Sequence, residues 1–147
     1  MVRILLLLSL FFFPIKSNAL IEVDITRGNL NPLPIAVSPL SIDDNSKKNF
    51  EKILKKKNIG SEIAIVVENN LKASGLFNPL NRDAFLQAPD IANLKPRFED
   101  WNLIKAQALI TGKVNFVNDK LRVEFRLWDV LAGKEMMALA FTTVPNN

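Results

Sequence analysis

Residues 61–82 limit the folds open to this chain more than any other stretch of its sequence. They read SEIAIVVENNLKASGLFNPLNR, and four of them recur at the spacing of one helix face: Ile63, Val67, Leu71 and Ser74. Ser61 is suited to cap the start of this helix, and Gly75 to end it in the left-handed conformation. Pro79 prevents further helix. The stretch predicts an amphipathic helix, a glycine stop and a short extended segment, so the fold must supply a layer that covers the apolar face.

The first 19 residues have the pattern of a secretory signal peptide. A short basic start precedes the almost wholly apolar run Ile4–Phe13, and Ser17 and Ala19 place small residues at the −3 and −1 positions of a cleavage site. We therefore expect export and cleavage after Ala19. An uncleaved membrane anchor is the alternative, but the apolar run is too short to span a bilayer comfortably.

The segment Leu20–Thr26 would form the mature N-terminus, and it alternates apolar and polar residues as a strand does. Residues 20–32 therefore read as a strand followed by a stiff linker. The pattern leaves two interpretations open, an edge strand of the domain's own sheet, which the pattern favours, or a detachable strand that adds to a partner's sheet. The residues concerned are Leu20, Ile21, Glu22, Val23, Asp24, Ile25 and Thr26.

Two segments with opposite character follow. The apolar run Ile35–Ser38 is typical of a buried central strand. Residues 41–59 are polar and rich in lysine, with three apolar residues at helical spacing: Phe50, Ile53 and Leu54. We interpret this segment as a solvated insertion held by a few apolar anchors. A short basic helix on an anionic membrane or partner is the alternative.

The middle of the chain predicts shorter elements. Residues 76–80 read as an edge strand because Pro79 cannot donate to a sheet. Residues 82–95 have little pattern and predict a surface loop, whereas residues 96–104 predict a short helix that begins at a proline. Residues 108–114 predict a strand, in which Gly112 is a candidate bulge.

The last third has the clearest β pattern. Apolar residues alternate with polar residues from Leu121 to Trp128, between turns at Asn118-Asp119 and Ala132-Gly133, and residues 135–143 would return as the next strand. Trp128, at the end of the wet face, is a candidate for contact with a neighbouring layer or a partner. The order of elements predicts an α/β fold, a mixed sheet with helices packed on it that ends in an antiparallel meander.

Little catalytic chemistry is available to this chain. It has no histidine, cysteine or tyrosine, which excludes Ser-His-Asp triads, cysteine nucleophiles, disulfides and the usual zinc sites. The acid pairs Asp43-Asp44 and Glu99-Asp100 are explained by solvation and by the helix dipole. Without the signal peptide, 17 basic and 15 acidic residues would remain, a balance too even to indicate a nucleic-acid partner. We expect no enzyme, metal or cofactor.

Four segments in order along the chain resemble the TolB family, the periplasmic component of the Tol–Pal system. The most specific is NLKASGLFNPLNR at 70–82, and the others are PIAVSP at 34–39, ALITGKV at 108–114 and FRLWD at 125–129. The resemblance implies that residues 33–147 form the family's amino-terminal α/β domain, which a six-bladed β-propeller follows in the family. It also implies a periplasmic, non-enzymatic role in outer-membrane integrity and envelope invagination during cell division.

The resemblance also implies partners. In the family the extreme mature N-terminus is a strand-like motif for TolA, which maps here to Leu20–Thr26 and favours the detachable strand. The propeller binds the lipoprotein Pal, and because propeller repeats are absent, Pal binding maps to no residue here. A further helix of the family's domain would follow Asn147, so we expect a fragment with an exposed core face. Residues 41–59 are longer than the family leads us to expect.

Two other functions stay open at this point. The chain could be a non-catalytic fragment of an exported enzyme. It could also be a basic domain that associates with the envelope surface through Lys47–Lys57.

Overall fold

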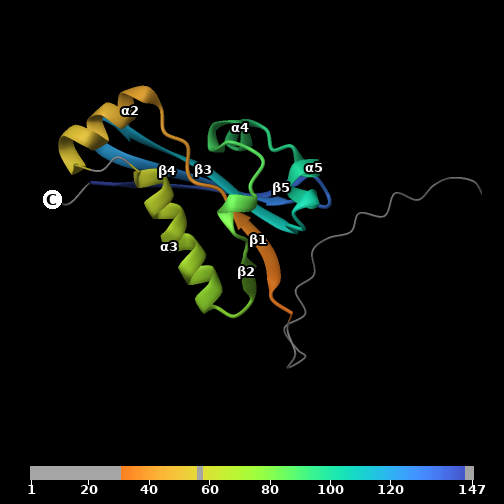
Figure 1. Cartoon of the computed structure of the whole chain (residues 1–147). Coiled ribbons are helices and arrows are strands. Elements are labelled where there is room, and N and C mark those ends of the chain that lie inside the picture. The colour runs from red at the N-terminus through yellow and green to blue at the C-terminus, as the bar shows by residue number, and fades with distance from the viewer. Residues whose placement is uncertain (1–30, 56–57, 145–147) are drawn as a thin grey trace, which may run out of the picture.

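A five-stranded mixed sheet forms the centre of the computed structural model, which describes residues 31–55 and 58–144 (Figure 1). The strands follow the order β2-β1-β3-β4-β5, and their bounds are Leu33–Val37 (β1), Phe77–Pro79 (β2), Ala108–Val117 (β3), Lys120–Asp129 (β4) and Lys134–Thr143 (β5). β1 is parallel to both of its neighbours, and β3, β4 and β5 form an antiparallel meander. The predicted fold class is therefore confirmed.

Helices make the two crossovers that the parallel strands require. Between β1 and β2 lie α2 (Asp44–Asn49), the π-helical turn η2 (Phe50–Leu54) and α3 (Ile59–Ala73). Between β2 and β3 lie the 3₁₀ turn η3 (Arg82–Ala84), α4 (Pro89–Leu94) and α5 (Phe98–Leu103). Within the described residues, none of these helices has the length and apolar character needed to cross a membrane.

The two sets of helices cover opposite faces of the sheet, because successive strand residues point to opposite faces. Ala36 and Leu109 pack with Trp101 of α5. On the other face, Val37 packs with Ala64 of α3 in a cluster that also contains Phe50. Figure 1 shows α2 and α3 grouped apart from α4 and α5. The predicted burial of Ile35–Ser38 is confirmed, since β1 lies between two strands.

The main helix, α3, confirms most of the opening prediction. Ile63, Val67 and Leu71 pack against the core, and Gly75 has φ +73°, the left-handed conformation predicted for the helix end. The predicted cap was wrong, because α3 begins at Ile59 with Asn58 at the capping position and no side-chain cap bond. The extra turn is possible because residue 60 is a glycine: a Cβ there would collide with the carbonyl oxygen of Leu40.

The segment 82–95 was predicted as a surface loop, and this was wrong. It contains α4, and Gln87 in front of that helix is buried. The side-chain oxygen of Gln87 accepts the indole N–H of Trp101 at 2.8 Å and the backbone N–H of Arg97 at 3.1 Å. These hydrogen bonds fix the segment against the following helix. They could not be predicted from the sequence, because the segment has no periodic apolar pattern. The short helix predicted at 96–104 is confirmed by α5.

The predicted bulge at Gly112 was also wrong. Gly112 pairs regularly with Phe125, and a Cβ on it would collide with the carbonyl oxygen of Glu124 and lie 3.2 Å from the Leu40 side chain. Glycine is therefore required by close packing. The irregularity in the meander lies instead between Leu127 and Trp128, where β4 meets β5.

The predicted turns of the meander are confirmed. Asn118 and Asp119 have φ of 49° and 57°, the two positive values of a tight hairpin between β3 and β4. Gly133 has φ +63° before β5.

The lysine-rich segment forms α2 and η2. Of its three predicted anchors, Phe50 is buried, and the side chains of Ile53 and Leu54 lie outside the described part of the chain. The ring of Phe50 meets Phe116 edge-on at 6.0 Å. The hydroxyl of Ser46, also buried, accepts the backbone N–H of Phe116 at 2.8 Å. The exposed lysines of α2 and η2 include Lys47, Lys48 and Lys52.

Candidate interaction surface: an open apolar face and a free strand edge

Among the described residues, one half of the sheet has apolar side chains that no helix covers. On the side that carries α3, Leu127 of β4 pairs with Met137 of β5, and Phe125 pairs with Leu139. Phe141 continues the β5 row. We define the open apolar face as these side chains of β4 and β5 together with their apolar neighbours on β3 and α3. Its residues are Val67, Ile110, Phe125, Leu127, Met137, Leu139 and Phe141.

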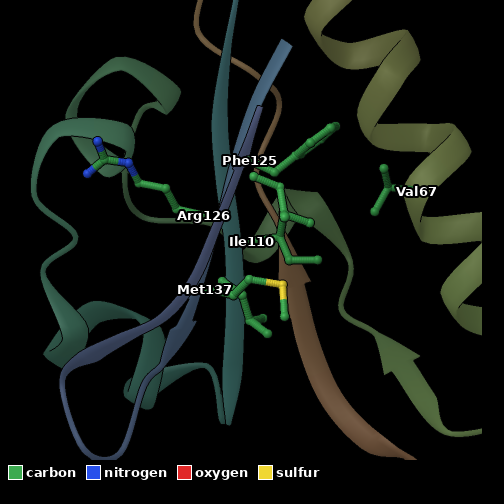
Figure 2. A pocket seen from close by; sticks show the side chains of 7 residues that line it. Val67, Ile110, Phe125, Arg126 and Met137 are labelled. Atoms are coloured by element: carbon green, nitrogen blue, oxygen red, sulfur yellow. The ribbon is translucent and has the colours of Figure 1, made fainter. Parts of the chain in front are cut away.

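A groove of about 250 Å³ separates α3 from this half of the sheet. Figure 2 shows Val67 of α3 on one side of the groove and Ile110 and Phe125 of the sheet on the other. Arg126 forms part of the wall, but its guanidinium group points away from the groove. The groove is therefore lined almost wholly by apolar groups, with no charge placed to hold a small polar ligand.

The exposure of the β5 side chains is high for residues of this type. Met137 is 51% exposed, Leu139 48% and Phe141 56%. On α3, Ile65 and Val66 are also exposed. Contiguous apolar exposure of this kind is typical of an interaction surface. It agrees with the expectation of an exposed core face.

The outer edge of β5 adds a second feature to this surface. Within the described part of the chain, β5 pairs only with β4, so one side of its backbone has no strand neighbour. Residues 136–143 contain neither a charge nor a proline. Natural edge strands are usually blunted by lysine, proline or bulges. In β5 the register shift and the charged residues Lys134 and Glu135 lie at the start of the strand, so residues 137–143 are left without such protection. The edge is therefore suited to pairing with another extended segment.

The opposite face of β4 and β5 is charged. Arg122 and Lys113 lie 2.9 and 3.4 Å from carboxylate oxygens of Glu124. Burial raises the pKa of Glu124, but the bonds and charges of these two cations outweigh it, so the pKa is lowered. Arg126 lies 3.5 Å from Glu135. On this face β5 presents small residues, Ala138 and Ala140.

Trp128 was a predicted contact residue, and its neighbours are within the chain. Its indole N–H donates to the hydroxyl of Thr111 at 2.9 Å, and its ring lies 5.9 Å from that of Phe98 on α5. It packs on a neighbouring layer, one of the two roles predicted for it.

The acid pairs lie at helix starts. Asp43 caps α2, because its carboxylate accepts the backbone N–H of Ser46 at 2.9 Å and the Ser46 hydroxyl at 2.7 Å. Chiefly the hydroxyl bond, and then the backbone bond, lower the pKa of Asp43. Asp100 lies in the first turn of α5, 2.6 Å from Arg97. Across residues 31–55 and 58–144, no group of three or more His, Cys, Asp or Glu residues is placed to hold a metal ion.

The predicted partner-binding residues, Leu20–Thr26, lie outside the described residues, as does the signal peptide. The site that the structure does describe was foreseen only as an exposed core face. Its signal in the sequence is the alternation of Met137, Leu139 and Phe141, which predicts a strand but does not say whether a layer covers it.

Two sequence comparisons place the chain among known proteins. Residues 21–136 match the family model described as the TolB amino-terminal domain. Over 134 residues, 91% of the chain, it is 82% identical to the Tol-Pal system protein TolB of Pelagibacter ubique (strain HTCC1062). The chain spans 30% of the length of that relative.

Solved structures share the fold at low identity. TolB from Acinetobacter baumannii superposes with a TM-score of 0.53 at 19% identity, over 78% of this chain and 23% of that one. The C-terminal domain of LpoB from Escherichia coli gives 0.55 at 12% identity, over 84% and 90% of the two chains. The same domain from Salmonella enterica gives 0.53 at 12% identity, over 80% and 87%. At these identities the likeness concerns the fold alone.

Proposed function

The chain belongs to the TolB amino-terminal domain family, and we propose on this basis that it is a component of the Tol–Pal system that acts in the periplasm. The observation that carries the proposal is the 82% identity to a Tol-Pal system protein TolB over 91% of the chain. Its role would be non-enzymatic support of outer-membrane integrity and of envelope invagination during cell division. The chain matches part of that relative, so these roles are proposed for the module, not for a whole protein.

The proposal divides the chain into three parts. Residues 1–19 would be a signal peptide that is removed after Ala19 on export. Residues 20–32 would be a partner-binding strand and its linker. Residues 33–147 would be the α/β domain that carries this strand. The basic start, the apolar run and the small residues at 17 and 19 support the first division.

The binding element would be Leu20–Thr26, and its partner TolA. An extended segment binds the edge of a sheet through main-chain hydrogen bonds, while alternate side chains supply specificity. The alternation of Ile21, Val23 and Ile25 with Glu22 and Asp24 suits this mode. No residue of this chain is assigned to Pal.

A calorimetric titration with the periplasmic domain of TolA tests this function. The chain would be expressed from Met1, purified from the periplasm and checked by mass for cleavage after Ala19. A matched variant would carry seven Gly and Ser residues in place of Leu20–Thr26, which keeps the length of the chain. The exported chain should bind and the variant should not. An identical titration with the variant would refute strand addition.

Binding to vesicles separates this function from the surface-binding alternative. Lys47, Lys48 and Lys52 lie exposed on α2 and η2, and a basic surface of this kind would bind anionic vesicles with an affinity that falls steeply with salt. The Tol–Pal assignment predicts TolA binding that replacement of these lysines by glutamine leaves unchanged. If that variant lost TolA binding, the lysine surface would be favoured as the binding site over Leu20–Thr26.

A further inference from the structure

We propose that two copies of this chain pair through their β5 edges, antiparallel about a two-fold axis at Ala140, so that their two sheets become one continuous sheet. The occupant of the free edge is thus a second copy of the same strand. The inference goes beyond the proposed function, because it concerns the chain in the absence of any other protein.

The two edges of the described sheet differ in what they offer to an added strand. On β2, Leu76 and Leu80 bond to β1 through their backbone groups, so the alternation turns Phe77 and Pro79 outward. Pro79 has no N–H, and β2 is only three residues long. β5 presents ten residues without a proline. The β5 edge is therefore the one that a second copy would pair with.

The part of β5 that can pair regularly is defined by its own sequence and register. From Met137 to Thr143 the strand is level with β4 residue by residue, and the register shift lies before Met137. Lys134 and Glu135 also lie before it, and residues 137–143 carry no charge. The midpoint of these seven residues is Ala140. An axis at Ala140 therefore pairs all seven and leaves the charges and the shift outside the contact.

Symmetry keeps the two apolar faces on the same side. A two-fold axis that pairs identical strands antiparallel stands perpendicular to the sheet, so each face of one copy continues into the same face of the other. With the axis at Ala140, Leu139 lies beside the partner's Phe141 and Met137 beside the partner's Thr143. No apolar side chain is placed opposite the charged face in this arrangement.

The pairing joins apolar side chains that are half exposed in the single copy. Leu139 is 48% exposed and Phe141 56%. Leu139 pairs with Phe125 of β4, and the Phe125 and Phe141 rings lie 6.4 Å apart. Across the axis, Leu139 would also contact the partner's Phe141. Aromatic and aliphatic side chains side by side on neighbouring strands stabilise a sheet, so the join would protect the sides of these residues from water.

The charged face does not oppose the pairing. On this face the contact consists of small residues, with Ala140 beside the partner's Ala140 and Ala138 beside the partner's Thr142. The nearest acids, Glu124 of each copy, lie behind Ala140 on β4. Three strand spacings, about 14 Å, separate them. Each is also neutralised by Arg122 and Lys113 of its own copy, so little repulsion remains.

The size of the contact predicts a weak dimer. A standard interface buries about 30–40 Å² per residue. Seven residues from each copy would then bury about 400–600 Å² in total, below the roughly 1,000 Å² of a stable complex. Main-chain hydrogen bonds supply most of the affinity in this mode of pairing. We therefore expect a dimer that forms and dissociates with concentration.

Sedimentation velocity over a hundredfold range of concentration measures this equilibrium. The chain would be expressed from Met1 and purified from the periplasm, and its average mass should rise toward that of a dimer. Ala140→Lys should keep it monomeric, because two lysines would meet at the axis, while Glu124 on β4 accommodates the lysine within each copy. Ala132→Lys, in the exposed turn before β5, is the matched control and should dimerise normally. A native chain that stays monomeric up to about 1 mM would overturn the proposal, as would dimerisation that Ala140→Lys leaves unchanged.

Engineered disulfides test the register, since the chain has no cysteine of its own. Ala140→Cys should form a bridge between copies under mild oxidation, because residue 140 lies directly beside its counterpart. Ala138→Cys is the control: residue 138 lies beside residue 142 of the other copy, about 14 Å along the strand from its counterpart. The bridge at 140 should form at least tenfold faster than the bridge at 138.

Equal rates at the two positions would overturn the pairing. A bridge that forms faster with Leu139→Cys than with Ala140→Cys would also overturn it, and would indicate that the open apolar faces pack against each other. Both experiments use this chain alone. Their failure leaves the proposed binding of TolA untouched, and failure of TolA binding leaves the pairing untouched.

Discussion

Trp101 donates its indole N–H to the side-chain oxygen of Gln87 at 2.8 Å, and both side chains are buried. This bond joins α5 to the segment that precedes α4. The ring of Trp101 also meets Phe85 edge-on at 5.0 Å. One polar contact therefore fixes the aromatic residue on which this face of the sheet packs.

Replacement of Gln87 should destabilise the fold. Gln87→Ala leaves the buried indole N–H of Trp101 without an acceptor, which costs about 1–3 kcal/mol. Urea unfolding followed by tryptophan fluorescence measures the free energy of unfolding. Gln107→Ala is the matched control, because Gln107 is exposed, and it should change this free energy by less than about 0.5 kcal/mol. Equal effects of the two substitutions would contradict the role given to Gln87.

Gly60→Ala should destabilise the fold although it introduces a better helix former. In an exposed helix the change would contribute about 1 kcal/mol of stability. Here the new Cβ would collide with the carbonyl oxygen of Leu40, so α3 must shift away from the chain that follows β1. We expect a net loss of about 1–3 kcal/mol, measured by thermal unfolding. A stabilised variant would show that α3 does not lie this close.

Acid should remove the contribution of Asp43 to stability. The Ser46 hydroxyl and backbone N–H lower the pKa of Asp43. A carboxylate with a lowered folded pKa stabilises the fold above its unfolded pKa, near 4, and this contribution is lost as the pH falls through the folded value. Asp43→Ala should therefore cost about 1 kcal/mol at pH 7, typical of a helix cap, and less at pH 3.

The control for this pH dependence is Asp44→Ala. The Asp44 side chain is 91% exposed and contacts only Lys47 in the described salt bridges, so its loss should cost under about 0.5 kcal/mol at pH 7. A cost of Asp43→Ala that stays the same from pH 7 to pH 3 would contradict the role of its carboxylate.

A double-mutant cycle should show real coupling between Glu68 of α3 and Arg82 of η3. The two side chains lie 2.7 Å apart and are 19% and 24% exposed, so water screens the pair less than at the surface. We expect a coupling of about 1–2 kcal/mol. The exposed pair Asp44–Lys47 should give less than about 0.5 kcal/mol in the same denaturation assay. Equal couplings would rule out a special role for the shielded pair.

Elements with a long pattern could be predicted from the sequence. The spacing of Ile63, Val67 and Leu71 defined α3, and Gly75 defined its end, because these signals are local. The alternation in residues 121–128 defined β4 for the same reason. The family resemblance added a function, since the stretch at 70–82 is specific, although that stretch itself serves as scaffold.

Features that depend on distant contacts could not be predicted. Gly60 and Gly112 are each required by the approach of Leu40 or Glu124, so neither fits a local rule for glycine. The helix α4 is different, because Pro89 at its start and Asp90 in its first turn are local signals, of the same kind as those that predicted α5, and they could have identified it. The open apolar face also depends on packing, because an alternating strand reads the same whether or not a layer covers it.

A titration of the N-terminal peptide alone measures most directly whether Leu20–Thr26 is the partner-binding element. A synthetic peptide of residues 20–32 would be titrated into the periplasmic domain of TolA, beside a peptide of the same composition in scrambled order. The peptide of native sequence should bind at least as tightly as the whole exported chain, and the scrambled peptide should not bind. Binding by the whole chain but not by the peptide of native sequence would place the binding surface elsewhere in the domain.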